Sequence, residues 1–398
     1  MPITIDKPPV RDEASKDRER LVAVEERTTR TETREGLAIV LAVCALGAII
    51  GLAVLLVGLT RGSDGSSAAP SEAVSAPAEA GAAENDPGAQ AGAASDAVAD
   101  VEPYKRPDPA LPAIPAGPVK KFKVDVFEHV TKVSKEKPAT RVWSFGVNGV
   151  LHRGTGVSTP MVVEQGDKVE MTLVNGGSKK MDVTFPHSID FHSSEVAPNK
   201  AFKTIGPGKT HKFSFVAKHP GVYMYHCATD PVLMHTGAGM VGMMIVKPRN
   251  LAPVDRELWL TQQEFYIGKP GKDADAAKMA EKKPDVIAFN GFAAQYKDKP
   301  IAVKRGEKIR MYVMNAGPSI WSAFHVIGTV LDKTVIEGTT GRNAQTVNLA
   351  PSQGGWVEFT LDEEGTYPFV THGFGDMVKG AVGVLATERA PKGAGKKH

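Results

Sequence analysis

One cysteine lies in an arrangement with histidines and a methionine that suits binding of a soft metal. Cys227 is followed by His235 and Met240, and His187 lies upstream of all three. A thiolate, two imidazoles and a weak axial thioether are the ligand set of a type 1 copper site. The glycines between His235 and Met240 allow a tight loop that carries two ligands close together. The spacing therefore predicts that His187, Cys227, His235 and Met240 bind one copper ion.

Strand alternation separates a second group of possible ligands from the first. His226 and Cys227 are neighbours, and neighbouring side chains on a strand point to opposite faces. His187 and His192 are an odd number of positions apart, so they also diverge if their segment is extended. His192 is therefore grouped with His226, and Asp190 shares the parity of His192. We expect a second metal site with two histidines and a carboxylate, linked to the first site through adjacent residues.

The C-terminal half of the chain offers a third histidine for this second site. Catalytic metals commonly have three protein ligands plus an open position. His372 occupies the repeat position of the segment that contains Cys227, whereas Ala381 stands where Met240 would be. We expect the C-terminal half to have lost a type 1 site while keeping one metal-binding histidine.

These residues lie among short β-branched and aromatic runs punctuated by Gly, Pro and Asn, a texture typical of β-sandwiches or barrels. The region contains an internal repeat with a period of about 140 residues, in which 239–242 matches 380–383. The repeat predicts an all-β fold of two tandem Greek-key domains. We expect these domains at residues 118–250 and 251–390, followed by a basic tail at 391–398.

The N-terminal part of the chain is expected to anchor the protein. Residues 1–36 are polar, and residues 37–59 contain no charged side chain. A helix of that length spans about 34 Å, enough for a hydrocarbon core of roughly 30 Å. A cleaved signal peptide is the alternative, but the preceding region is too long and the apolar run exceeds the usual range. Residues 60–117 are rich in Ala, Gly, Ser and Pro, which predicts a disordered, flexible linker.

The distribution of charged residues predicts where the protein lies and argues against one class of partner. Arg27, Arg30 and Arg34 lie just before the predicted span, and after Arg61 no Lys or Arg occurs until Lys105. The positive-inside rule then predicts a single-pass protein with a cytoplasmic N-terminus and extracytoplasmic domains, either periplasmic or on the outer face of the cell membrane. A formal net charge of +3 without a clustered basic face argues against nucleic-acid binding. We expect residues 268–285 to form a solvated, partly helical surface insertion.

His325 matches the His187 region by repeat position, and on position alone a structural role in a β core is equally plausible.

Four segments carry a resemblance to a known family: FPHSIDFH at 185–192, YHC at 225–227, QQEFY at 262–266 and FHVIG at 324–328. Through them the sequence resembles, over roughly residues 120–388, the copper-containing nitrite reductases, a family of enzymes with two cupredoxin domains. The loop from Cys227 to His235 is one residue shorter than the commonest family pattern.

The resemblance implies a site, an activity and partners. Nitrite would be reduced to nitric oxide at a type 2 copper, with electrons entering through a type 1 copper from a small cupredoxin or a c-type cytochrome. Each chain would hold one copper of each type, and the chains would form a homotrimer. The implied type 1 ligands are His187, Cys227, His235 and Met240. The implied type 2 ligands are His192, His226 and His372 of a neighbouring subunit. Asp190 and His325 would handle protons, and Ile327 would shape the substrate pocket.

Two other functions are alternatives to nitrite reduction. A two-domain multicopper oxidase depends on His-X-His pairs, but no such pair occurs in the chain and Cys227 is followed by Ala228. A non-catalytic, membrane-tethered electron carrier would need only the type 1 site. It would leave His192, His226 and His372 without a role.

Overall fold

The computed structural model describes residues 101–176 and 183–387. The predicted membrane span at 37–59, most of the predicted linker and the tail at 391–398 lie outside these described residues. Within the described ranges, no helix is both long enough and apolar enough to cross a membrane.

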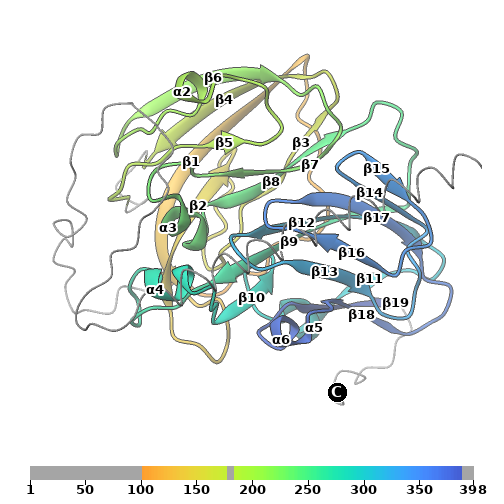
Figure 1. Cartoon of the computed structure of the whole chain (residues 1–398). Helices are drawn as coiled ribbons and strands as arrows, with labels where there is room; N and C mark the ends of the chain where they lie inside the picture. The colour runs from red at the N-terminus through yellow and green to blue at the C-terminus, as the bar shows by residue number, and fades with distance from the viewer. Residues whose placement is uncertain (1–100, 177–182, 388–398) are drawn as a thin grey trace, which may run out of the picture. The chain divides into compact units, whose positions relative to one another are not determined.

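The first domain is a sandwich of two four-stranded sheets, with strand orders β2-β1-β4-β6 and β3-β8-β7-β5 (Figure 1). Strand β4 shows why these residues form a half-buried sheet, because Val169, Met171 and Leu173 alternate with more exposed polar residues and point into the core. The strands are β1 (Val119–Thr131), β2 (Thr140–Val147), β3 (Met161–Glu164), β4 (Lys168–Asn175), β5 (Asp190–Phe191), β6 (Thr210–Val216), β7 (Gly221–His226) and β8 (Val241–Lys247), with short helices α2 (Pro198–Ala201) and α3 (Val232–Gly237).

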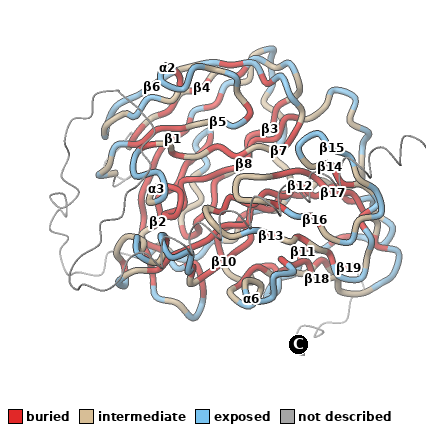
Figure 2. Tube along the Cα trace, viewed as in Figure 1, coloured by how far each residue is buried: buried red, intermediate tan, exposed pale blue. Residues whose placement is uncertain are grey.

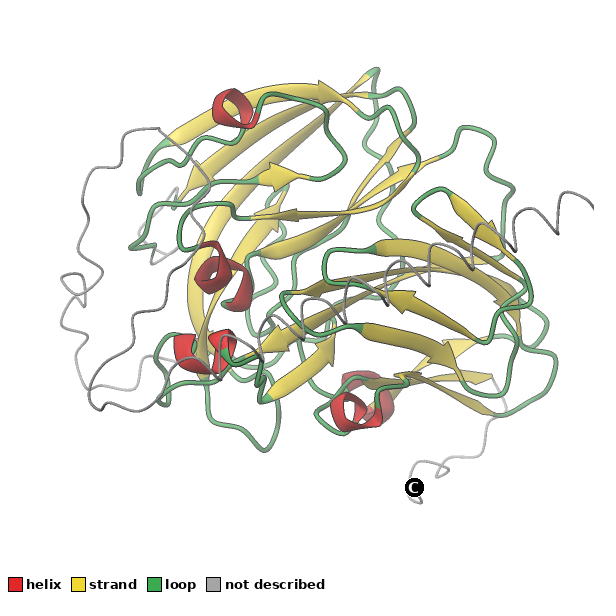
Figure 3. Cartoon of the chain, viewed as in Figure 1, coloured by secondary structure: helices red, strands yellow, loops and turns green. Residues whose placement is uncertain are grey.

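The second domain repeats this design with a six-stranded sheet, β10-β9-β12-β17-β14-β15, and a five-stranded sheet, β11-β19-β18-β13-β16. The all-β prediction is confirmed for the described residues, where only short helices accompany the strands (Figure 3). The elements are β9 (Arg256–Phe265), α4 (Ala276–Ala280), β10 (Val286–Phe289), α5 (Gln295–Asp298), β11 (Lys299–Val303), β12 (Lys308–Gly317), β13 (Ser322–Val326), β14 (Lys333–Ile336), β15 (Thr339–Gly341), β16 (Thr346–Leu349), β17 (Gly354–Thr360), β18 (Thr366–Thr371), α6 (Phe374–Met377) and β19 (Val382–Thr387).

A separate apolar cluster joins the two domains. Val222 and Met224 of β7 pack in one buried cluster with Trp259 of β9, Tyr312 of β12 and Trp356 of β17. Figure 2 shows buried residues running along the strands of both domains. Burial of large aromatic side chains is a major source of interface stability, so this cluster should hold the domains in one fixed arrangement.

The last part of the predicted linker contacts the folded strands. The amide of Glu102 donates to the Val130 carbonyl at 2.9 Å, and the amide of Leu111 donates to the Glu257 carbonyl at 3.1 Å. Leu111 also packs against the interdomain cluster. The average composition of residues 60–117 predicted flexibility throughout, but the apolar side chains near its end have a core to bury against.

The insertion at residues 268–285 contains the short helix α4 and is mostly exposed or half-buried, as its charge predicted, but it also makes buried contacts that its charge did not predict. Met279 of α4 is only 1% exposed. A Cβ added at Gly237 of α3 would come within 2.8 Å of the Met279 sulfur, so the two short helices pack closely. The amide of Arg141 on β2 also donates to the Lys272 carbonyl at 2.9 Å. This insertion from the second domain therefore supports a helix of the first domain.

Strand β1 buries a histidine whose protonation should affect stability. Burial, aided by the positive charge of Arg153, lowers the pKa of His129 from 6.5 to about 4. Below pH 6.5 the unfolded chain then binds a proton that the folded chain does not, so stability falls as the pH falls towards 4. The shift corresponds to about 3 kcal/mol. We expect His129→Leu to reduce the loss of unfolding free energy between pH 7 and pH 4, measured by urea titration; an unchanged loss in this variant would contradict the assignment.

Candidate metal centre

Three possible ligand atoms converge at one end of the first domain. The Cys227 sulfur lies 3.3 Å from Nδ1 of His235 and 3.9 Å from Nδ1 of His187. The two Nδ1 atoms are 3.1 Å apart. All three side chains are buried, and their ligand atoms lie within 4.8 Å of one another. Unprotonated nitrogen and sulfur at such separations can bind a single metal ion in common.

Backbone hydrogen bonds fix the segments that carry these residues. His187 and Ile205 exchange both of their backbone hydrogen bonds, at 3.0 and 2.9 Å. Cys227 comes directly after β7, and its amide donates to the Met240 carbonyl at 3.1 Å. The Met240 amide donates to the His235 carbonyl at 3.1 Å, and the Met240 side chain is fully buried. The backbone of Met240, the fourth expected ligand, is therefore hydrogen-bonded to both Cys227 and His235.

The electrostatics of this cluster favour a thiolate. Burial alone would raise the pKa of the Cys227 thiol, but His187 and His235 beside the sulfur outweigh it and lower that pKa to about 5. The Ser188 amide also points a donor at the sulfur, at 3.4 Å. A buried thiolate with two imidazoles is a soft donor set that fits type 1 copper, and Met240, buried in the same core, is the residue that could add the weak thioether.

A second pair of histidines lies on the other side of the same strand end. Nε2 of His192 is 3.1 Å from Nε2 of His226, with the two rings nearly perpendicular. Asp190 on β5 pairs with His226 on β7 in the sheet register. Partial burial and the neighbouring His226 lower the pKa of His192, which favours the neutral ring that a metal binds. The structure thus places His187 with Cys227, and His192 with His226.

His372 lies in the second domain and does not join the histidine pair within one chain. Among the described residues, the only group of three His, Cys or acidic side chains with converging atoms is the one around Cys227. The ring of His372 is instead 5.5 Å from that of His325 and 4.6 Å from that of Phe374. The exposed apolar side chains of Trp321, Ile327 and Phe374 occur in the segments that carry these two histidines.

Two residues beside the cluster were not identified from the sequence. The Trp143 ring packs edge-on against the rings of His187 and His235, at 5.5 and 5.0 Å between centroids. Glu128 is fully buried beside His187. A signal for Glu128 exists in the sequence, because it has the inward parity of Val124 and Val126 on β1 but carries a charge. Nothing in the local sequence around Trp143 indicates its contacts.

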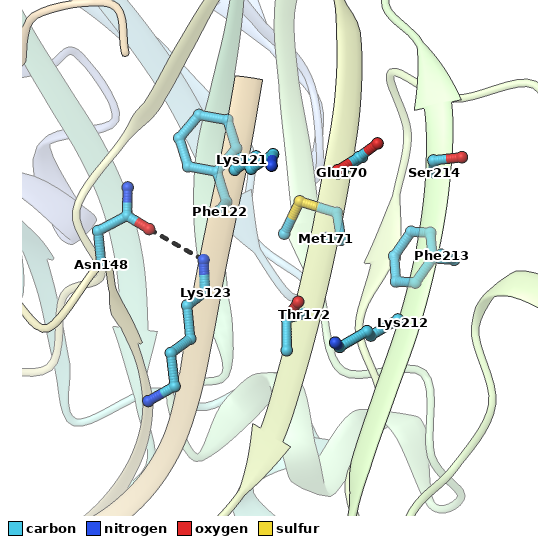
Figure 4. Close-up of a pocket in the computed structure, with 10 residues that line it drawn as sticks. All are labelled: Lys121, Phe122, Lys123, Asn148, Glu170, Met171, Thr172, Lys212, Phe213 and Ser214. Carbon is cyan, nitrogen blue, oxygen red and sulfur yellow. Dashed lines mark hydrogen bonds between the residues drawn. The ribbon is translucent and has the colours of Figure 1, made fainter. Parts of the chain in front are cut away.

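An open groove of about 530 Å³ crosses β1, β4 and β6 of the first domain, away from the histidines (Figure 4). Three lysines and Glu170 contribute to it, but Lys123 is already paired with Asp125 at 2.6 Å. None of the expected metal ligands lines it. Mixed surface charge on the outer face of a sheet does not make this groove a catalytic site.

The paired sandwiches and the thiolate–imidazole cluster define a cupredoxin-like protein. A family model described as multicopper oxidase matches residues 135–251. The copper-containing nitrite reductase of Neisseria gonorrhoeae is 39% identical over 239 residues, which are 57% of this chain and 60% of that protein. This chain thus spans 60% of the length of that relative.

Solved structures agree with the sequence relatives. The copper nitrite reductase of Nitrosomonas europaea is 28% identical, with a TM-score of 0.61, and the match covers 68% of this chain and 94% of that one. The copper-containing nitrite reductase of Thermus scotoductus SA-01 is 29% identical, with a TM-score of 0.59 and coverage of 69% and 62%. A multicopper oxidase structure at 20% identity and a TM-score of 0.58 shares the fold. The resemblance to copper-containing nitrite reductases is confirmed.

Proposed function

We propose that this protein is a copper-containing nitrite reductase that forms nitric oxide. The observation that carries the proposal is the adjacency of His226 and Cys227 at the end of β7. Cys227 belongs to a buried thiolate–imidazole cluster, and His226 belongs to a histidine pair on the other side of the strand. Two metal sites that share neighbouring residues are suited to a one-electron reduction, because a short covalent path joins them.

The chain's own residues account for both sites. His187, Cys227, His235 and Met240 would hold a type 1 copper, and His192 and His226, with His372 of a neighbouring subunit, would hold a type 2 copper. Bound copper would supply one-electron redox chemistry at the first site and Lewis-acid binding of nitrite at the second. The overall reaction consumes one nitrite, one electron and two protons, and yields one nitric oxide and one water.

Proton supply falls to Asp190 and His325. Asp190 lies in register with His226 beside the histidine pair, where a carboxyl group can give a proton to a departing oxygen. Nδ1 of His325 contacts the Gln345 carbonyl, which can only accept a hydrogen bond, so Nδ1 carries a proton. Nε2 is then the ring nitrogen that would take up and deliver the second proton. Ile327, which is 41% exposed, would limit the size of the substrate that can approach.

The proposed partners follow from what surrounds each site. Val232 and Leu233 on α3 are exposed apolar residues that directly precede the ligand segment with His235. A small apolar surface near the type 1 site suits transient docking of a small cupredoxin or a c-type cytochrome. The apolar run at 37–59 would anchor the chain in the membrane, with both domains on the extracytoplasmic side.

Copper content and gas exchange test this function against its rivals. The full-length copper-loaded protein should contain two copper ions per chain and consume nitrite without consuming oxygen. A multicopper oxidase would contain four copper ions and consume oxygen, and an electron carrier would contain one and consume neither. Four coppers or one copper per chain, in protein with full visible absorbance, would contradict the proposal.

Assembly can be tested by mixing two inactive variants. His192→Ala and His372→Ala should each abolish turnover, because each removes a type 2 ligand. In a head-to-tail ring, some interfaces of a mixed trimer combine the intact His192 of one chain with the intact His372 of another. Activity should therefore return in part after subunit exchange. A mixture that exchanges subunits, shown by mass spectrometry, but stays inactive would mean that each chain builds its own site.

A further inference from the structure

The carboxylate of Glu128 lies behind the candidate metal centre. Nδ1 of His187 faces Nδ1 of His235 and the Cys227 sulfur, so Nε2 is the ring nitrogen on the far side. Oε1 of Glu128 is 3.6 Å from this Nε2, and both side chains are completely buried. Within the described residues, Nε2 of His187 is a buried nitrogen without a hydrogen-bond partner. Glu128 thus places an ionisable hydrogen-bond acceptor next to Nε2 of His187, a buried nitrogen that lacks a hydrogen-bond partner.

Other groups hold the Glu128 carboxylate in this place. The Thr184 amide donates to Oε1 at 3.0 Å, and the Thr184 hydroxyl donates to Oε2 at 3.4 Å. Nη1 of Arg141 lies 3.6 Å from Oε2, and Nε of Arg141 lies 3.5 Å from Oδ1 of Asp273. A buried charge is tolerated when it is paired and hydrogen-bonded. The polar contacts therefore run from His187 through Glu128 and Arg141 to Asp273, which belongs to the insertion at 268–285.

We propose that Glu128 is a positioning residue for the type 1 centre. In the copper-loaded protein its carboxylate accepts a hydrogen bond from the Nε2–H group of His187. This hydrogen bond fixes the orientation of the ring and leaves Nδ1 free for the metal. Outer acceptors of this kind orient metal-bound histidines, and their loss typically costs about 10- to 100-fold in metal affinity. The negative charge also stabilises the more positive oxidation state of the centre, so it lowers the reduction potential. This inference rests on the proposed function, because it requires copper at this site.

The opposite charges of Glu128 and Arg141 predict opposite shifts of the reduction potential when each is removed. Removal of the negative charge in Glu128→Gln should raise the reduction potential, whereas removal of the positive charge in Arg141→Gln should lower it. Glu128→Asp keeps the charge and should keep the potential closer to that of the unaltered protein than Glu128→Gln does. A purely structural role would not produce shifts of opposite sign from the two ends of one ion pair.

The experiment uses the full-length copper-loaded protein and follows the copper–thiolate absorption during a redox titration. Chelator competition measures the copper affinity of the same variants, with an expected loss of about 10- to 100-fold in Glu128→Gln. Glu170→Gln, which changes a carboxylate on the outer side of β4, is the matched control and should shift neither quantity. Equal potentials in all variants, or shifts of the same sign for Glu128→Gln and Arg141→Gln, would overturn the inference.

A second measurement needs no substitution and decides the matter if Glu128→Gln does not fold. In the copper(I) form of the unaltered protein labelled with ¹⁵N-histidine, Nε2 of His187 should carry a proton that exchanges slowly with solvent. A His187 ring without a protonated Nε2 would overturn the inference while leaving the proposed function intact. If the unaltered protein shows no copper–thiolate band at all, the proposed function fails and this inference fails with it.

Discussion

Cys227→Ser should abolish the intense visible absorption of the copper-loaded protein and reduce nitrite turnover to background. The hydroxyl is nearly isosteric with the thiol but cannot form the soft thiolate bond that gives a type 1 centre its absorption and its affinity. His192 and His226 lie on the other side of β7, so the second copper should remain bound and visible by electron paramagnetic resonance. Loss of one centre without the other is the signature of two separate sites.

The chain supplies a matched control in its other cysteine. Cys44→Ser changes the cysteine within the predicted membrane span and should leave the visible band and the turnover intact. Persistence of the strong band in Cys227→Ser, or loss of both coppers together, would contradict the assignment of Cys227 to a separate type 1 centre.

Asp190→Asn should lower the rate of nitrite reduction by roughly 10²- to 10⁴-fold, the usual contribution of a positioned acid or base. Asparagine keeps the shape of the side chain but cannot release a proton at neutral pH. Asp190 is not one of the proposed ligands, so the copper content should stay at two ions per chain. The variant should also keep the visible band, because the thiolate cluster is on the opposite side of the strand end.

Asp362→Asn provides the comparison, since it changes an exposed carboxylate in the second domain. It should turn over nitrite at the rate of the unaltered protein. Near-normal turnover of Asp190→Asn between pH 5 and pH 8 would remove Asp190 from the proton supply and leave the ligand assignments unaffected.

Strand alternation alone predicts the two separate groups of histidines from the sequence. His226 ends β7 and Cys227 directly follows it, so their opposite directions are a local property that adjacent positions in the sequence predict. The all-β fold was predictable for the same reason, because short alternating runs such as Lys168–Val174 define half-buried strands. Local periodicity therefore predicts which face a residue occupies.

Contacts between segments that are distant in sequence were not predictable in this way. Met279 supports Gly237 across the domain boundary, although its segment reads as a charged surface insertion. Trp143 contacts the rings of His187 and His235, and its amide donates to the carbonyl of Ala238, which directly follows α3; nothing in the sequence around Trp143 indicates these contacts. Such packing depends on tertiary arrangement, for which hydropathy and spacing carry no signal.

The central claim is that nitrite becomes nitric oxide at a site that this chain builds, and isotope-labelled turnover tests it most directly. The full-length copper-loaded protein is incubated under anaerobic conditions with ¹⁵N-nitrite and a reduced dye that donates one electron at a time. The gas that forms is analysed by mass spectrometry. We expect one ¹⁵N-nitric oxide for each electron consumed by the unaltered protein, and none from Cys227→Ser. Dye oxidation that yields no labelled nitric oxide, from protein that carries two coppers per chain, would contradict it.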